Sequence, residues 1–453
     1  MAKEKEIRVN GITEGIIWKQ ILVFFFPILF GTFFQQLYNA ADAVIVGRFV
    51  GKEALSAVGG STGTIINLMV GFFTGLSSGA TVIISQYYGA KRKEMVRFAV
   101  HTAIAFSLLG GVVLMIVGFF GAPQILRWMK TPKEVMDAAV IYIRIYFLGV
   151  IGNLIYNMGA GILRAIGDSK KPLYFLIASC GTNIVLDLLF VVALRMGVAG
   201  AALATILSQL LSAILVLVVM MKTRDMYRFE PRLLRLDGEI LKRIVQIGFP
   251  AGLQSVMYSF SNIIIQSSVN SLGTDTVAAW TSYGKIDSMF WMIISAFGIS
   301  ITTFVGQNYG AGKFDRVRKG VGQCMLMSAL TTALLSTILY NFGSYGLRLF
   351  TQDPAVIEIG TQILKFLVPV YFTYITIEIL SGTLRGMGDC WIPTLISLLG
   401  ICVIRVIWNM VVVPRYPHIY TIITSYPMTW TITSISYAIY YFKFSQKKNM
   451  KNA

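Results

Sequence analysis

Polar side chains that could hold a cation or a proton recur at helical spacing inside apolar stretches of this 453-residue chain. In the stretch FFQQLYNAADAVIVG, one helix face would carry Gln35, Tyr38, Asn39 and Asp42. A carboxylate inside a membrane is costly unless it is paired, hydrated or protonated, so Asp42 is a candidate for cation coupling. Its three neighbours on that face are candidates for substrate binding or gating. The alternative is that Asp42 lies near the outer interface and is simply hydrated.

A second polar set lies further along the same half of the chain. Asn183 precedes Asp187 by one helical turn, and Asn153 and Asn157 form a similar pair. Asn157, Asn183 and Asp187 could join Asp42 around one cation, H⁺ or Na⁺, with Asn153 placed toward the substrate. The alternative is that these side chains only hydrogen-bond between helices, at about 0.6 kcal/mol per bond.

The second half carries a different set of charged residues within its apolar stretches. Asp287 and Glu378 are candidates for substrate binding or gating. Lys285 and Asp287 are two residues apart and would not face each other on a helix. An ion pair of one of these acids with Lys365 or Arg405 is an equally good interpretation.

Pro27 precedes Asp42 by fifteen residues in the same apolar stretch. Proline removes a backbone hydrogen bond and permits a helix to kink. We therefore expect Pro27 to act in gating, by letting the helix that carries Asp42 bend.

No catalytic or metal-binding pattern accompanies these residues in the sequence. The chain has two histidines, His101 and His418, and four cysteines without metal-like spacing. The segment GGSTG at 59–63 fits the GxSxG pattern, but no strand precedes it, as a nucleophile elbow requires. We therefore expect no enzyme, no resident metal and no organic cofactor.

The composition does not suit a water-soluble protein. Apolar residues make up 55% of the chain and charged residues 13%, against about 25% charged in soluble domains. Apolar runs as long as a bilayer core requires predict a polytopic, all-α membrane protein with twelve transmembrane helices. The predicted spans are 16–45, 55–84, 95–121, 135–160, 171–194, 198–221, 240–269, 277–305, 317–343, 357–381, 391–413 and 419–442.

The net charge of +18 follows from the expected membrane topology. Lys and Arg gather in the first residues, in alternate loops, in the segment KTRDMYRFEPRLLRLDGE and in the tail, whereas the opposite loops hold few. Cytoplasmic loops of membrane proteins carry this excess. The asymmetry predicts cytoplasmic termini in a multi-pass protein of a bacterial-type plasma membrane, and it explains the charge without nucleic acid as a partner.

The two halves of the chain repeat each other. GILRAIGDSKKP at 161–172 matches GTLRGMGDCWIP at 382–393, and the same shift aligns QYYGAK with QNYGAG. Six spans per half is an even number, so the halves keep one orientation, related by a pseudo-two-fold axis along the membrane normal, as in known transporters. We predict an N-lobe at 1–221, a cytoplasmic linker at 222–239 and a C-lobe at 240–453.

The glycines and prolines of the repeated loop have a structural interpretation. Gly167 and Gly388 suit a positive-φ turn that closes a helix, and Pro172 and Pro393 suit the first turn of the next helix. We therefore expect this motif to maintain the fold and its gating and not to contact substrate.

The twelve spans, the paired LRxxGD…P loops and the first-span Pro…QLYNxxD motif together resemble the multidrug and toxic compound extrusion family of transporters. The resemblance covers residues 16–442 and is strongest to the bacterial branch of damage-inducible and Gram-positive multidrug exporters. It implies two six-helix lobes that exchange a cation for an organic, often cationic, compound. It also implies that Asp42 is the first-helix coupling acid and that Pro27 is the residue at which that helix bends.

The same resemblance matches Asn157, and Asn183 with Asp187, to family positions in the fourth and fifth helices. Another branch of the family has essential acids in its seventh and tenth helices. This chain lacks them around Tyr258 and Tyr374, and its Glu378 is displaced by about one turn. The coupling ion is therefore left open between H⁺ and Na⁺.

The function expected from the sequence is a monomeric, cation-coupled antiporter that exports small organic compounds by alternating access. The alternative is a flippase for a lipid-linked oligosaccharide or cell-wall precursor, which would need a basic cavity for a pyrophosphate. The spans offer mainly Arg144, Lys285, Lys365 and Arg405 for that purpose.

Overall fold

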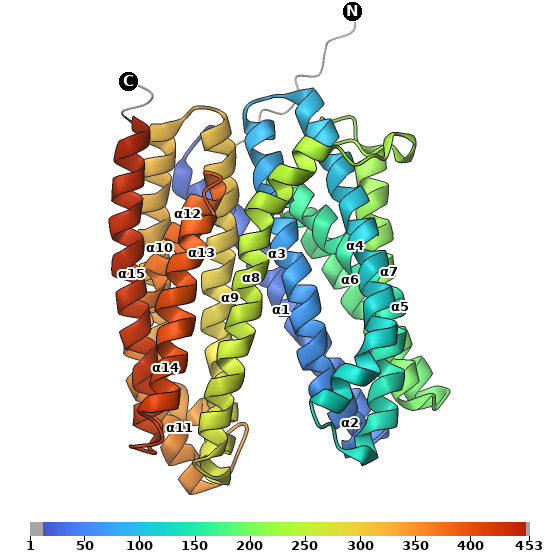
Figure 1. The fold of residues 1–453 in the computed structure, drawn as a ribbon, viewed down its shortest axis with the longest axis vertical. Coiled ribbons are helices and arrows are strands. Elements are labelled where there is room, and N and C mark those ends of the chain that lie inside the picture. The colour runs from blue at the N-terminus through green and yellow to red at the C-terminus, as the bar shows by residue number, and fades with distance from the viewer. Residues whose placement is uncertain (1–11, 450–453) are drawn as a thin grey trace, which may run out of the picture. The chain divides into compact units, whose positions relative to one another are not determined.

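The computed structural model describes the backbone of residues 12–449 and the side chains of residues 12–443 (Figure 1). Every regular element in this range is helical. The α-helices of the first half are α1 (Ile17–Phe49), α2 (Lys52–Gly59), α3 (Ser61–Gly89), α4 (Lys93–Trp128), α5 (Lys133–Ala165), α6 (Lys170–Asp187) and α7 (Gly197–Lys222). Those of the second half are α8 (Gly238–Asn270), α9 (Thr274–Gly310), α10 (Phe314–Leu347), α11 (Pro354–Leu367), α12 (Phe372–Gly386), α13 (Trp391–Ser397), α14 (Ile404–Val411) and α15 (Ile419–Asn449). Short π or 3-10 segments are η1 (Leu188–Ala193), η2 (Pro231–Leu233), η3 (Val368–Val370) and η4 (Leu398–Val403).

Helices of the described chain occupy all twelve predicted stretches. Nine stretches are long and apolar enough to cross a membrane, and α11 with α12, which meet at an angle of 52°, form a tenth if counted as one span. Helices α8 and α15 are as long but more polar. The all-α polytopic fold is therefore confirmed, and most helices continue a few residues beyond the apolar runs into polar segments. The predicted cytoplasmic termini lie largely outside the described residues.

The repeated loop motif adopts the same backbone conformation in both halves. Gly167 and Gly388 have φ angles of 96° and 89°. In the first copy, the amides of Gly167 and Asp168 donate to the carbonyls of Arg164 and Leu163, and the second copy repeats both bonds. A residue with a Cβ is strained at such φ angles, so the predicted structural role of these glycines is confirmed.

The chain divides into two compact units. The first comprises Met1–Glu14, Phe26–Gly252 and Gly310–Gly312, and the second comprises Gly15–Phe25, Leu253–Tyr309 and Lys313–Ala453. Helix α1 therefore enters the first unit next to Pro27, and α8 leaves it two residues after Pro250. Both helices remain continuous through their prolines. The lobe bounds at 221 and 240 stay a prediction.

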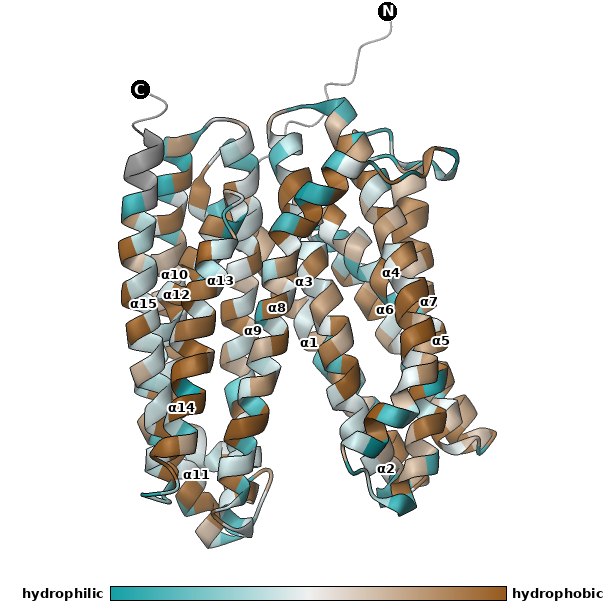
Figure 2. Cartoon of the chain, in the orientation of Figure 1, coloured by the Kyte–Doolittle hydropathy of each residue, from teal (hydrophilic) through white to brown (hydrophobic). Residues whose placement is uncertain are grey.

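In the first unit, α5 packs against α3, α4 and α7. Glycines allow these helices to approach closely: a Cβ on Gly149 of α5 would collide with Ile206, and one on Gly118 of α4 would collide with Phe147. Other apolar side chains of α4, such as Val113, are exposed. In Figure 2, the most hydrophilic residues lie mainly near the ends of the helices. Small residues between helices and large apolar residues on outer faces are typical of a helical bundle in lipid.

Helices α3 and α8 cross at close range within the first unit. A Cβ on Gly75 would lie 2.4 Å from the Cα of Gly252, and a Cβ on Gly79 would lie 2.7 Å from the backbone nitrogen of Gly248. Each helix thus contributes a GxxxG pair, the motif that brings membrane helices into backbone contact. The first part of α8 is therefore packed tightly on α3.

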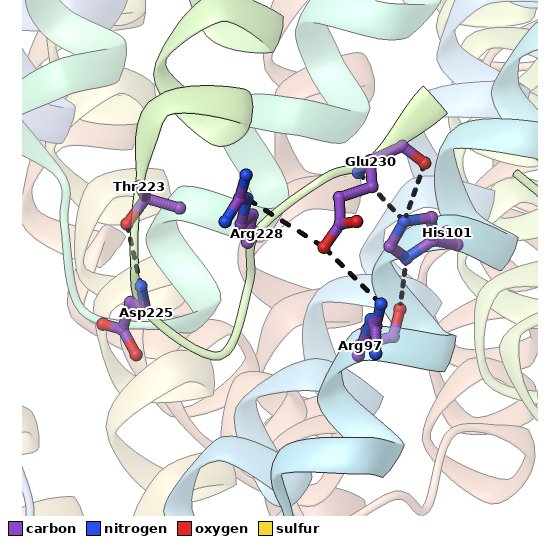
Figure 3. A network of polar contacts seen from close by, with 6 residues as sticks. All are labelled: Arg97, His101, Thr223, Asp225, Arg228 and Glu230. Carbon is purple, nitrogen blue, oxygen red and sulfur yellow. Dashed lines mark hydrogen bonds and ion pairs between the residues drawn. The ribbon is translucent and has the colours of Figure 1, made fainter. Parts of the chain in front are cut away.

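The charged segment between α7 and α8 is bound to the first unit (Figure 3). His101 of α4 is buried. Its Nε2 accepts a hydrogen bond from the backbone amide of Glu230 at 3.1 Å, and its Nδ1 donates one to the Arg97 carbonyl at 2.7 Å. The Glu230 carboxylate lies 3.5 Å from Arg97 and 3.9 Å from Arg228. Phe229 is buried in the core of this unit. The segment is therefore an attached part of the first unit.

In the second unit, α12 packs against α10 and α15, and α10 also packs against α11. The hydroxyl of Tyr437 on α15 donates to the carbonyl of Pro393 at 2.7 Å and lies 2.8 Å from the hydroxyl of Ser397. These bonds attach α13 to α15 near the second copy of the repeated loop.

Candidate functional site

Two acids within the membrane-spanning helices of the first unit, Asp42 and Asp187, are buried near each other. Asp42 of α1 is 7% exposed, and Asn183 and Asp187, one turn apart on α6, are 0% exposed. The charges of Asp42 and Asp187 are close enough to interact electrostatically. The alternative in which Asp42 is simply hydrated at the interface does not agree with this burial.

The polar atoms of these three residues are largely without partners. Within the described residues, no hydrogen bond reaches Oδ1 of Asp42, either carboxylate oxygen of Asp187, or the amide oxygen and nitrogen of Asn183. None of the ion pairs in the described chain includes either acid. A buried anion without a partner is unfavourable, so these oxygens suit a bound cation or a proton.

A larger metal site is not evident near these oxygens. No group of three His, Cys, Asp or Glu side chains in the described part of the chain could hold a metal ion. Two carboxylates and one amide offer only hard oxygen ligands. The donor set therefore fits H⁺ or Na⁺ better than a transition metal.

Three further neighbours of this group, Tyr142, Thr205 and Ser208, were not predicted. Tyr142 interacts electrostatically with Asp42, as does the predicted Tyr38. The buried Tyr38 hydroxyl lies near those of Thr205 and Ser208 on α7 but makes no hydrogen bond within the described structure. A sequence signal was present, because Thr205 and Ser208 are three residues apart in a mainly apolar span.

Asn157 lies away from this group. Its Nδ2 donates to the carbonyl and to Oδ1 of Asn153, both at 2.9 Å. It follows Tyr142, the α5 residue near Asp42, by fifteen residues, which is about 22 Å along the helix at the usual rise per residue. This rise along α5 separates Asn157 from Asp42, and the coupling role of Asn157 stays a prediction.

The other candidate residues of α1 differ in exposure. Pro27 is buried and Tyr38 is half-buried, whereas Gln35 and Asn39 are exposed. Polar side chains within a span commonly face protein or a water-filled passage and not lipid. Their predicted roles in gating and substrate binding are compatible with this placement and stay predictions.

In the second unit, Asp287 of α9 is held by three uncharged donors. The hydroxyls of Tyr283 and Tyr371 donate to its Oδ1 at 3.0 and 2.5 Å, and Nε1 of Trp291 donates to its Oδ2 at 2.7 Å. The Trp291 ring in turn packs edge-on against Trp430, at a centroid distance of 6.2 Å. Asp287 is therefore a carboxylate in an aromatic setting without an ion-pair partner in the described chain.

The ion pairs considered for the second half are not found among the described residues. Lys285 and Lys365 are exposed, and Arg405 donates to the Thr429 hydroxyl at 2.9 Å, not to an acid. Glu378 packs against Gly298, where an added Cβ would collide with it. Pairing with Lys365 or Arg405 therefore does not explain Asp287 or Glu378.

Comparisons with known proteins agree with the fold. The MatE family model matches residues 27–189 and 250–411, one match in each half. Probable multidrug resistance protein YoeA of Bacillus subtilis (strain 168) is 30% identical over 392 residues, covering 85% of this chain and 84% of that protein. Probable multidrug resistance protein YpnP of the same strain is 32% identical over 402 residues, covering 88% and 89%.

A solved structure agrees as well. The outward-facing conformation of a multidrug resistance MATE family transporter of the MOP superfamily aligns with a TM-score of 0.90 at 23% identity. The alignment covers 98% of this chain and 100% of that one. At this identity the likeness supports the fold alone.

A polytopic helical fold with unpartnered acids inside its spans is typical of a membrane transporter. The chain belongs to the MatE family, the multidrug and toxic compound extrusion family that its loop and first-span motifs resemble. Members of this family are transporters, so the expectation that the chain is no enzyme is confirmed. The paired family matches also confirm the internal repeat.

Proposed function

We propose that this protein exports small organic compounds, mainly cations, across the plasma membrane in exchange for H⁺ or Na⁺. The names of YoeA and YpnP, both probable multidrug resistance proteins, support this class of cargo. The observation that carries the exchange is the set of buried oxygens on Asp42, Asn183 and Asp187 that have no hydrogen-bond partner among the described residues. No cofactor enters the scheme.

In this proposal, the bound H⁺ or Na⁺ compensates the negative charge of Asp42 and Asp187. When it leaves, two neighbouring carboxylates remain buried, and repulsion and lost hydration both disfavour that state. The protein must then admit water or another cation, and a change of α1 near Pro27 would do so. Because a ligand shifts a conformational equilibrium only through unequal affinity for its states, cation binding favours the state with the buried acids.

The second unit offers a place for the substrate's positive charge. Asp287 accepts hydrogen bonds from Tyr283, Trp291 and Tyr371, and none of these donors carries a positive charge. An organic cation near it would be attracted by the carboxylate and by the faces of the surrounding aromatic rings. Substrate binding at Asp287 and cation binding at Asp42 would then lie in different units of the chain.

Gradient-driven export from liposomes tests this function. Purified protein is reconstituted, and efflux of the fluorescent cation ethidium is followed under a pH gradient without Na⁺ and under a Na⁺ gradient at fixed pH. We expect one gradient to drive efflux above the level of protein-free liposomes. Absence of efflux under both gradients would contradict the proposal and favour the lipid-linked flippase, which a fluorescent lipid-translocation assay would then test.

A further inference from the structure

Arg405 of α14 is a buried cation in the second unit. Its side chain is 5% exposed, and its Nη2 donates to the Thr429 hydroxyl at 2.9 Å. Its Cζ lies 4.1 Å from the centroid of the Tyr426 ring. Its Nε is buried without a hydrogen-bond partner in the described structure. The ion pairs of the described residues do not include Arg405.

These contacts do not compensate a buried guanidinium. The group carries five N–H donors and a permanent charge. One hydroxyl and one aromatic face replace only part of the hydration that the charge loses on burial. Arginines inside membrane-spanning segments normally pair with an acid or with backbone carbonyls. Arg405 has neither in the described chain, so an anion from outside the protein could compensate its charge.

The surroundings of Arg405 suit an organic anion. The phenols of Tyr258, Tyr374 and Tyr426 lie within electrostatic range of it. Phenol hydroxyls donate hydrogen bonds to oxyanions, and their rings pack against aromatic ligands. Arg405 also follows the π segment η4 by two residues, and such segments are frequent at functional sites in helices.

We propose that Arg405 binds an oxyanion of the transported compound, such as a carboxylate, so that the substrates include zwitterions as well as cations. This inference rests on the export function proposed above. The guanidinium fork matches a carboxylate with two parallel hydrogen bonds, and its Nε is available for one of them. Tyr426, whose ring centroid lies 4.1 Å from Cζ of Arg405, also interacts electrostatically with Asp287, so a zwitterion would find a partner for each of its charges in this unit.

A pair of dyes that differ by one carboxylate tests the site. Tetramethylrhodamine is a zwitterion, and its methyl ester is a cation with the same chromophore. Their affinities for the purified protein are measured by fluorescence polarisation in neutral, lipid-free detergent. We expect the wild type to bind the free acid more tightly than the ester. Arg405→Gln should lower the ratio of acid to ester affinity about tenfold or more, because a charge-assisted bond is lost.

Two further variants separate binding from packing. Arg405→Lys keeps the charge and should retain part of the acid preference, whereas Arg415→Gln removes an exposed arginine just beyond the same helix and should retain all of it. Equal losses of affinity for both dyes in Arg405→Gln would mean a structural role and would overturn the proposal. A wild type without acid preference would also overturn it, while ethidium export would still stand for the proposed function.

A lipid headgroup is the other source of an oxyanion. Phosphatidylglycerol that co-purifies with the wild type but not with Arg405→Gln, measured by mass spectrometry, would reveal it. If phosphatidylglycerol co-purifies only with the wild type and the wild type does not prefer the acid dye, Arg405 binds a lipid headgroup and the substrate proposal is overturned. An acid preference in lipid-free detergent supports the substrate.

Discussion

Buried acids in this chain differ in what surrounds their charge. In the part of the chain that the structure describes, Asp42 and Asp187 have oxygens without a hydrogen-bond partner, whereas Asp287 accepts its hydrogen bonds from uncharged donors. The first arrangement leaves buried carboxylate oxygens unsatisfied, whereas the second satisfies its oxygens with hydrogen bonds. The two kinds of site therefore suit different tasks, exchange of an ion in one unit and attraction of a positive substrate in the other.

Truncation of Asp287 should destabilise the second unit. Asp287→Ala would leave the hydroxyls of Tyr283 and Tyr371 and the indole of Trp291 without their acceptor, at about 1–3 kcal/mol for a buried group left unsatisfied. We expect a clearly lower thermal unfolding temperature in detergent. Lys285→Ala, which removes an exposed charge two residues away, serves as the control and should change it little. Equal stability of both variants would show that these three bonds are not important for packing.

The sequence identified individual residues of the site, but it did not identify the residues on other helices that surround them. Asp42, Asn183 and Asp187 were found because a polar residue is unusual in an apolar span, and the structure brings them together. Tyr142 and Thr205 were missed, because the sequence does not state which helices are adjacent. The placement of Asn157 with the acids was suggested by residue type and by family resemblance, neither of which fixes height along a helix.

At the scale of elements, the two prolines of α1 and α8 lie where each helix passes from one compact unit to the other. The unit boundary falls next to Pro27 in α1 and two residues after Pro250 in α8. The charged segment after α7, in contrast, is attached to the first unit through His101 and Phe229. The charged segment therefore belongs to the first unit, whereas α1 and α8 each contribute residues to both units.

Loss of His101 should release the charged segment. His101→Ala removes the acceptor of the Glu230 amide and the packing against the Phe229 ring, 5.4 Å away by ring centroids. We expect faster trypsin cleavage within residues 222–239 of the folded protein, followed by gel electrophoresis. The matched control is His418→Ala, at the exposed second histidine of the chain. Unchanged cleavage in His101→Ala would show that other contacts suffice to hold the segment.

The helices themselves were predictable, whereas their irregularities were not. Apolar runs located all twelve helical stretches, because a helix that crosses a bilayer must be largely apolar for about 20 residues. The bend of 52° between α11 and α12 and the π segments η1 and η4 depend on packing between helices, which hydropathy does not report. The charged segment was interpreted as a joint because its charges outnumber the few apolar residues, such as Phe229, that attach it.

On the scale of the whole molecule, the halves share a backbone plan but not their chemistry. At the shift of 221 residues, Asn183 and Asp187 correspond to Ile404 and Trp408, so the second half lacks that pair of cation ligands. It has Asp287 and Arg405 instead, each without an ion-pair partner among the described residues. A repeated fold with two different sets of buried charges is suited to coupling a cation in one half to an organic substrate in the other.

The measurement that tests this account most directly is substrate-driven cation flux. Liposomes containing the purified protein are loaded with ethidium and a pH-sensitive dye, and ²²Na⁺ entry is followed in a parallel sample. The account predicts that outward substrate movement drives entry of H⁺ or Na⁺ in the wild type. Asp42→Asn and Asp187→Asn should lower that entry at least about tenfold, because an amide neither takes up a proton nor neutralises a cation. Asp275→Asn, at an exposed position, should match the wild type. Cation entry at the wild-type rate in well-folded Asp42→Asn and Asp187→Asn proteins would contradict the account.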